Sequence, residues 1–186
     1  MKYYRIIDDI NYPQRWHLGD IIEVKDNWPF IYGKKIDVEL LVKELHVKIY
    51  KDGNPMDYTT SEAYSIPIVS ELLKKQLGGV RDLQFIPVKI WDKSIDLRYF
   101  IMVATNKLDC VNEELSVFGK FAENDPIRPD LAGNYSWFTK LIIDEAKAEG
   151  KDVFRIAKAC HYLIISQRVK DAIEDVNAIG AKFIEV

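Results

Sequence analysis

The sequence predicts an α+β protein built mainly from antiparallel sheet, with a few helices that include one near 67–77 and one near 167–178. Three observations support this fold class. Hydrophobic residues make up 48% of the 186 residues and aromatic residues 12%, which is ample material for a packed core. Short β-branched and aromatic runs recur between turn signals, as in sheet proteins. Apolar residues at helical spacing mark the two expected helices.

Residues 1–60 are expected to form short strands separated by turn-rich, aromatic segments. The opening segment Lys2–Ile7 is aromatic and β-branched, and two acidic residues end it. Residues 36–50 fit a helical stripe in their first half and alternate like a strand in their second half. The turn signal at 51–55 favours a strand directly before it. Further short strands are predicted at Ile21–Val24 and Met56–Thr59.

The middle of the chain is expected to contain one helix and then a meander of strands. Pro67 can open a helix, because its missing N–H would have no partner in the first turn, and Gly78-Gly79 can end it. The densest apolar runs follow, and they are typical of central strands covered on both faces. These runs are Leu83–Trp91 and Leu97–Thr105, joined by a turn at 92–96, with a third strand at Leu108–Val111 that could continue the meander.

The last third is expected to hold a long loop, several strands and the second helix. Residues 121–135 read as a loop that is long for a compact domain. Ser166 can cap a helix whose apolar stripe includes Val169 and Ile173, and Gly180 can end it. A polar link at 144–152 could contain a helical turn. The predicted strands are Phe138–Ile143, Val153–Ile156, Tyr162–Ile165 and Ala181–Val186.

Length and charge restrict the class of protein. We expect a single domain over 1–186, with a possible soft division near 78–82. The net charge of −3 and the scattered basic residues disfavour direct nucleic-acid binding. Two cysteines, no signal-like N-terminus and no long apolar stretch predict a cytoplasmic protein with free thiols and no membrane span.

No pattern of catalytic or ligand-binding residues is found. The three histidines are far apart, and metal-binding, phosphate-binding and nucleophile-elbow motifs are absent from the sequence. We therefore predict no catalytic, metal-binding or cofactor-binding residues and no cofactor. Adjacent acids such as Glu113-Glu114 are more typical of caps and solvated turns than of acid/base pairs. Aromatic residues in the turn-rich N-terminal segments are instead candidates for contacts with a partner.

Short pieces spread along the chain resemble one known family. In order, these pieces are Asp8-Asp9, Gly53–Thr59, Ile66–Ser70, Gln84–Val88, Leu108–Val111 with Ser116, Ala132–Tyr135, Val153–Arg155, Leu163–Ser166 and Gly180–Phe183. With them in this order, the chain resembles immunity family eleven of bacterial polymorphic toxin systems, formerly a domain of unknown function with a myxobacterial prototype. It departs from the family pattern at Asn112, where an acid is expected, and at Thr105-Asn106.

The resemblance implies a non-enzymatic protein that binds a cognate toxin, often a nuclease, in the cytoplasm of the producing cell. The acidic balance fits a nuclease, because nucleases present basic clefts. A small hydrolase that uses Cys160 or a carboxylate pair, or an accessory protein of a secretion locus, remain the alternatives. Loop placement with aromatic or acidic character gives the predicted toxin-interface residues: Trp16, Trp28, Tyr32, Asp57, Glu113, Glu114, Asp125 and Asp130.

Overall fold

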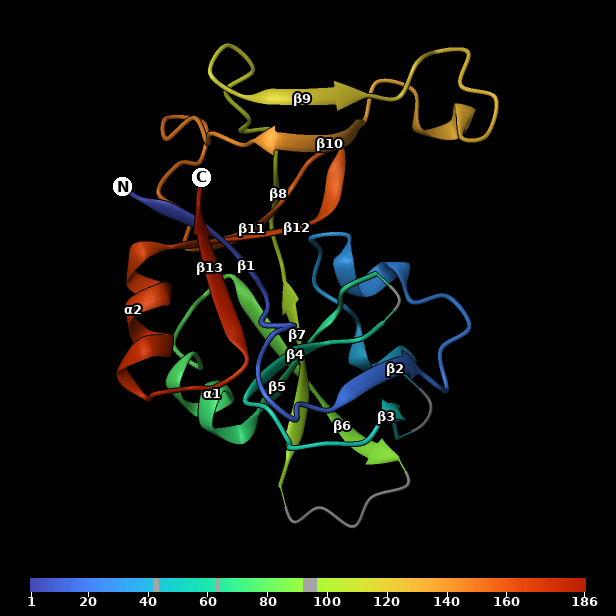
Figure 1. The fold of residues 1–186 in the computed structure, drawn as a ribbon, viewed down its shortest axis with the longest axis vertical. Coiled ribbons are helices and arrows are strands. Elements are labelled where there is room, and N and C mark those ends of the chain that lie inside the picture. The colour runs from blue at the N-terminus through green and yellow to red at the C-terminus, as the bar shows by residue number, and fades with distance from the viewer. Residues whose placement is uncertain (42–43, 63, 92–96) are drawn as a thin grey trace.

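The computed structural model describes residues 1–41, 44–62, 64–91 and 97–186. In these ranges the chain is mainly β-sheet, with two short α-helices and three 3₁₀ turns (Figure 1). It is thus richer in strand than the α+β prediction implied. Antiparallel pairing dominates, as expected, and only β3–β6 and β8–β11 pair in parallel among the described strands. The turn predicted at 92–96 lies outside the described residues.

The larger sheet has six strands in the described part of the chain, and it surrounds the first core cluster. Trp16, Phe30 and Ile101 are fully buried in that cluster. The strand predicted at Ile21–Val24 instead lies earlier, and among the described residues of 36–45 the helical stripe gives a 3₁₀ turn at Val38–Leu40. In spatial order the strands are β2 (His17–Ile21), β3 (His46–Lys51), β6 (Leu83–Trp91), β7 (Tyr99–Ala104), β5 (Pro67–Ser70) and β4 (Tyr58–Thr60).

The second large sheet joins both ends of the chain. The first strand and the last strand pair with each other, and β1 also pairs with β12. The strand predicted at Leu108–Val111 does not continue the meander, because it pairs in parallel with β11 of this sheet. In spatial order the strands are β13 (Ala181–Glu185), β1 (Tyr3–Asp8), β12 (Ala159–Ser166), β11 (Val153–Ile156) and β8 (Lys107–Leu108).

The helix predicted near 67–77 is present only in its second half, as α1 (Glu71–Gln76). The expectation that Pro67 opens it was wrong, because Pro67–Ser70 forms strand β5. All four residues of β5 are buried, and the strand pairs with β4 on one side and β7 on the other. A strand buried on both faces shows no alternation, so Val69 could be mistaken for part of the helical stripe.

The helix predicted near 167–178 is confirmed as α2 (Gln167–Asp175). As expected, Ser166 caps it: its Oγ accepts a hydrogen bond of 3.4 Å from the backbone N–H of Val169. Gly180, beyond the helix, has a φ of +95°. Helices α1 and α2 cover a second core cluster, which draws residues from both large sheets (Figure 1). None of the described helices is long and apolar enough to span a membrane.

A two-stranded ribbon, β9 (Val117–Lys120) and β10 (Tyr135–Lys140), lies at one end of the molecule (Figure 1). β9 was not predicted, and β10 begins three residues before the strand predicted at Phe138–Ile143. The 121–135 loop connects the two strands and contains the 3₁₀ turn Pro129–Leu131. The ribbon is attached to the second sheet through aromatic rings, since Phe138 lies 5.2 Å from Tyr162 between ring centroids.

Candidate functional site

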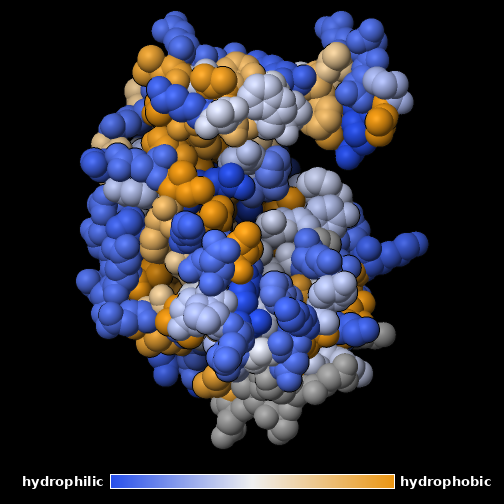
Figure 2. All heavy atoms as spheres, in the orientation of Figure 1, coloured by the Kyte–Doolittle hydropathy of each residue, from blue (hydrophilic) through white to orange (hydrophobic). Residues whose placement is uncertain are grey.

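A groove of about 480 Å³ separates the 121–135 loop from the rest of the molecule. Figure 2 shows the face hollowed at this position, below the lobe that the loop forms. Trp28 and Tyr32 line the groove on the side of the larger sheet, and Arg128 and Asp130 line it on the loop side. Cys160 and His161 lie between them, at the start of β12. The groove therefore brings together segments that are far apart in the sequence.

The aromatic wall of the groove is held in place by the 3₁₀ turn Trp28–Ile31. Phe30 and Ile31 are buried beneath it, so the turn cannot rotate away from the core. The ring of Trp28 stacks on Tyr32, with 6.2 Å between centroids, and contacts Tyr64 at 4.5 Å. Tyr32 itself is exposed. Large aromatic side chains held rigidly at a surface are typical of protein–protein contact sites.

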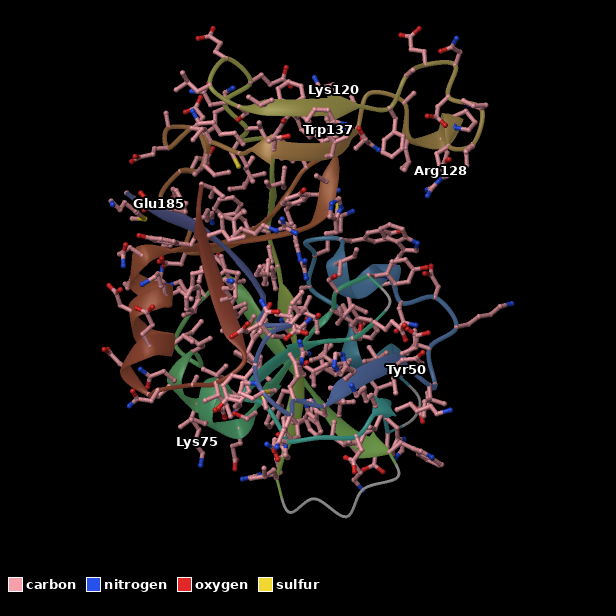
Figure 3. All side chains as sticks on the ribbon, viewed as in Figure 1. Tyr50, Lys75, Lys120, Arg128, Trp137 and Glu185 are labelled. Carbon is pink, nitrogen blue, oxygen red and sulfur yellow. The ribbon has the colours of Figure 1, made fainter. Side chains whose placement is uncertain are left out.

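The opposite wall is a loop organised by its own acidic residues. Asp125 accepts hydrogen bonds from the backbone N–H groups of Arg128 and Ile127, at 2.7 and 2.9 Å. Both bonds lower the pKa of Asp125, and the bond from Arg128 has the larger effect. Asp130 binds the guanidinium of Arg128 through two hydrogen bonds of 3.0 and 2.9 Å. Figure 3 shows Arg128 pointing from the loop toward the groove, so its position depends on both acids.

An acidic hollow of about 560 Å³ lies beside the groove. Four carboxylates and two lysines line it, and one of the lysines, Lys158, lines the groove as well. Glu113 accepts hydrogen bonds from Lys120 Nζ at 2.7 Å and from Tyr135 Oη at 2.6 Å. Both hydrogen bonds lower the pKa of Glu113, and the bond from Lys120 has the larger effect. The carboxylates are Asp109, Glu113, Glu114 and Asp144.

The structure separates the eight predicted interface residues into four groups. Trp28, Tyr32 and Asp130 lie in the groove, and Glu113 and Glu114 lie in the acidic hollow. Asp125 organises the loop, as described above. The other two serve the body of the molecule and are treated separately.

Trp16 and Asp57 occupy structural positions. The side chain of Trp16 is fully buried, 5.2 Å from Tyr99 between ring centroids, so it offers no surface to a partner. This corrects the expectation that Trp16 lies at the surface: its ring turns inward onto the core, although its neighbours form a turn. Asp57 accepts hydrogen bonds from Ser70 Oγ at 2.7 Å and from the backbone N–H of Ile179 at 3.1 Å.

Sequence reasoning missed the exposed face of the ribbon. Trp137 is half exposed and lies over Gly119, where an added Cβ would come within 2.4 Å of the indole Nε1. Val117 and Leu115, nearby, are also exposed. The signal was the alternation in β10, where Phe138 turns toward the core rings and Trp137 turns away. Without β9 the sequence could not show which face was covered.

The groove contains Cys160, the thiol named for the hydrolase alternative. Cys160 is half-buried and precedes His161, and both line the groove. Within the described residues, no hydrogen bond joins Cys160 to a histidine, and no group of three or more potential metal ligands is found. Cys110 is buried, and burial is the main reason that the pKa of its thiol is raised to about 12.

Comparison with known families gives a match over most of the chain. The model of the Immunity protein family (Imm11) matches residues 40–186. The chain belongs to the Imm11 family. The resemblance noted in the sequence is therefore confirmed, and no curated protein matches the chain. In this Imm11 protein the ribbon, the 121–135 loop and the acidic hollow all fall inside the matched range, whereas Trp28 and Tyr32 precede it.

Proposed function

We propose that this Imm11 protein binds a toxin made by the same cell and neutralises it without catalysis. The family match over residues 40–186 carries the proposal, because it supports an immunity role. Neutralisation of this kind needs a surface that is complementary to one protein target, and it requires no reactive group. The fold provides two neighbouring concave surfaces, the groove and the acidic hollow, which share Lys158.

The proposed contact surface combines aromatic and acidic side chains. Tyr32 and Trp28 offer rigid aromatic area at the groove, and such residues often contribute most of the binding energy of an interface. Glu114 and Asp109 are among the four acids of the hollow. The surface omits Trp16, which is buried, and Asp57, which is bound within the body of the molecule.

A nuclease is the toxin class that this surface fits best. Four carboxylates against two lysines give the hollow an excess of negative charge, and the whole chain carries −3. A nuclease must attract phosphates, so its active-site cleft is basic. An acidic surface would be steered toward such a cleft and would exclude nucleic acid from it.

The test is binding and protection with the product of the neighbouring gene. Co-purification as a one-to-one complex, with rescue of cells that express the toxin, is the expected result. Failure of both binding and rescue would contradict the proposed function. A toxin with no activity on nucleic acid would overturn only the nuclease assignment.

Two pairs of variants test whether the toxin binds at the proposed contact surface. Glu114→Lys should weaken toxin binding at least about tenfold, because it puts a cation against a basic partner, whereas Asp175→Lys at the end of α2 makes the same charge change elsewhere. Tyr32→Ala should weaken binding similarly, and Tyr50→Ala is its control. Tyr50 is 72% exposed on β3, away from the ribbon (Figure 3). Equal effects of variant and control would place the contact surface elsewhere.

A further inference from the structure

A further cavity, which shares His161 with the groove, lies against the strands of the second large sheet. Its volume is about 370 Å³, which falls in the range of sites for small molecules. Apolar side chains such as Ile6 and Leu163 form part of its wall. The titratable residues that line it are Arg5, Asp8, Asp9, Tyr58, Arg155, His161 and Lys182. Basic side chains therefore converge on one pocket of an acidic protein.

Arg155 is the unusual member of this group. It lies in the middle of β11 and is 1% exposed. Its one side-chain hydrogen bond in the described part of the chain runs from Nη1 to the carbonyl oxygen of His161, at 3.4 Å. Its Nε and Nη2 are buried and have no partner among the described residues. The other buried arginine, Arg15, binds the carboxylate of Asp8 at 2.5 Å.

A buried guanidinium without a carboxylate is costly. Burial is the main influence on the pKa of Arg155 and lowers it to about 10, with smaller opposing effects from Tyr58 and Cys160. A pKa near 10 still leaves the group charged at neutral pH. A buried charge that is not compensated costs several kcal/mol, so such groups in proteins are normally paired. The fold keeps a cation where the described residues supply no anion to it.

The neighbours of Arg155 add positive charge. The pKa of His161 is lowered to about 4, mainly by desolvation and to a smaller extent by the charges of Arg5 and Arg155. Part of the His161 side chain is still accessible from the groove. The three groups are therefore close enough to interact electrostatically. The guanidinium of Arg5 lies 4.1 Å above the ring of Tyr162, which holds it at the edge of the pocket.

Asp8 does not neutralise this cluster. Its Oδ2 is used by Arg15 and by Thr60, whose Oγ1 donates to it at 3.3 Å. Its Oδ1 is buried and has no partner in the described ranges. The pocket thus has cations in one part and an unused carboxylate oxygen in another. A ligand that fits would carry an anionic group and, beside it, a hydrogen-bond donor.

We infer that this pocket binds a small ligand through an oxyanion, a carboxylate or a phosphate, held by the guanidinium of Arg155. Nε and Nη2 are adjacent on one edge of the guanidinium, and that pair can donate to two oxygens of the same oxyanion. Arg5 and Lys182 contribute charge at the pocket, and Asp8 Oδ1 accepts from a donor on the ligand. Arg5, Arg155 and Lys182 are cations, and Cys160 lines the groove instead of this pocket, so the arrangement serves binding.

The first experiment measures binding of inorganic phosphate and of succinate to the whole chain by calorimetry, without any toxin. One site for at least one of the two anions is expected. Binding of phosphate alone assigns a phosphate-bearing ligand, and binding of succinate alone assigns a carboxylate. No binding of either anion at millimolar concentration would overturn the inference. Because no toxin is present, failure here leaves the proposed function untouched.

Variants test whether Arg155 holds the anion. Arg155→Lys keeps the charge and loses the two-pronged edge, so affinity should fall at least tenfold, and Arg5→Gln should reduce it several-fold. Arg98→Gln is the control, because Arg98 is exposed and pairs with Glu71 outside the pocket. Unchanged affinity in a folded Arg155→Lys protein would refute the assignment. If that variant does not fold, unchanged affinity in Arg5→Gln with no shift of the His161 ring resonance on adding anion would refute it.

Discussion

At the scale of single residues, Asp152 connects the start of one strand to the start of a helix. Its carboxylate accepts hydrogen bonds from Ser166 Oγ at 2.7 Å and from Arg168 Nε at 3.1 Å, and its backbone carbonyl accepts from the N–H of Ser166 at 2.8 Å. Ser166 in turn caps α2. Asp152 therefore positions the helix cap through side chain and backbone together.

Asp152 should make stability depend on pH in the acid range. The hydrogen bond from Arg168 has the largest effect on the pKa of Asp152 and lowers it. Burial opposes this effect, and the hydrogen bond from Ser166 lowers the pKa further, so that it lies below its ordinary value. The stabilisation is therefore complete above the unfolded pKa of about 4 and is lost as pH falls through the lower, folded pKa. Asp152→Asn should reduce the free energy of unfolding at pH 7 by about 1 kcal/mol, because Arg168 is largely exposed. Urea unfolding at pH 7 and pH 3 measures this: the difference between the two proteins should be smaller at pH 3, and an undiminished difference there would contradict it.

Gly180 is a second residue whose identity is fixed by its surroundings, because they leave no room for a side chain. Its φ is +95°, and an added Cβ would lie 2.1 Å from the carbonyl oxygen of Tyr58. Gly180→Ala should cost at least about 2 kcal/mol of unfolding free energy, because both the backbone angle and a close backbone contact oppose it. Gly79→Ala is the matched control, since nothing lies within 4 Å of its Cβ position. Chemical denaturation should show the control unchanged or stabilised by up to about 1 kcal/mol.

At the scale of elements, the β9–β10 ribbon depends on one set of rings. Phe138 contacts Tyr135 at 4.8 Å, Tyr162 at 5.2 Å and Phe118 at 6.0 Å between ring centroids. Of these four rings, only Tyr162 belongs to the second large sheet. The rings therefore form the joint between the ribbon and the body.

Removing Phe138 should loosen the ribbon more than the rest of the molecule. Phe138→Ala should cost about 2 kcal/mol, since the ring is half-buried, and should speed hydrogen exchange in β9 and β10 more than in β6 and β7. Thr139→Ala is the control on the same strand, because Thr139 is exposed. Uniform exchange across both pairs of strands would show that the ribbon is not a separate unit of stability.

The elements also show how far local sequence signals reach. Ser166 and Gly180 are local sequence signals for the start and the end of a helix, so α2 was predicted with its ends nearly correct. At Pro67 the same kind of reasoning failed, because burial of β5 between β4 and β7 outweighed a local helix-start signal. β8 was predicted as a strand but assigned to the wrong sheet, since a parallel partner 48 residues away leaves no local mark.

At the scale of the whole molecule, charge should govern how fast the protein meets its toxin. The chain carries −3, and four carboxylates line the hollow. The association rate with a basic toxin should fall by roughly tenfold when NaCl rises from about 50 to about 500 mM, because salt screens the steering field. Stopped-flow mixing measures the rate. A rate that does not change with salt would exclude acidic steering.

The candidate site was predicted in parts and assembled only by the fold. Loop placement identified Trp28, Tyr32 and Asp130, yet it gave the same status to Trp16, whose burial depends on packing against Tyr99. Arg155 gave no signal at all. In the run Val153–Ile156 it resembles an outward residue of a strand, and only the covering of both faces of β11 buries it.

The two cysteines differ in exposure, so a thiol-reactive dye can label one of them selectively. Cys110 is shielded from solvent, and its raised pKa suppresses the thiolate that reacts with alkylating agents, whereas Cys160 is partly accessible in the groove. A maleimide dye should therefore attach to one sulfur without any engineering of the chain. Attached there, it would report directly, by its own emission, whether a partner has entered the groove.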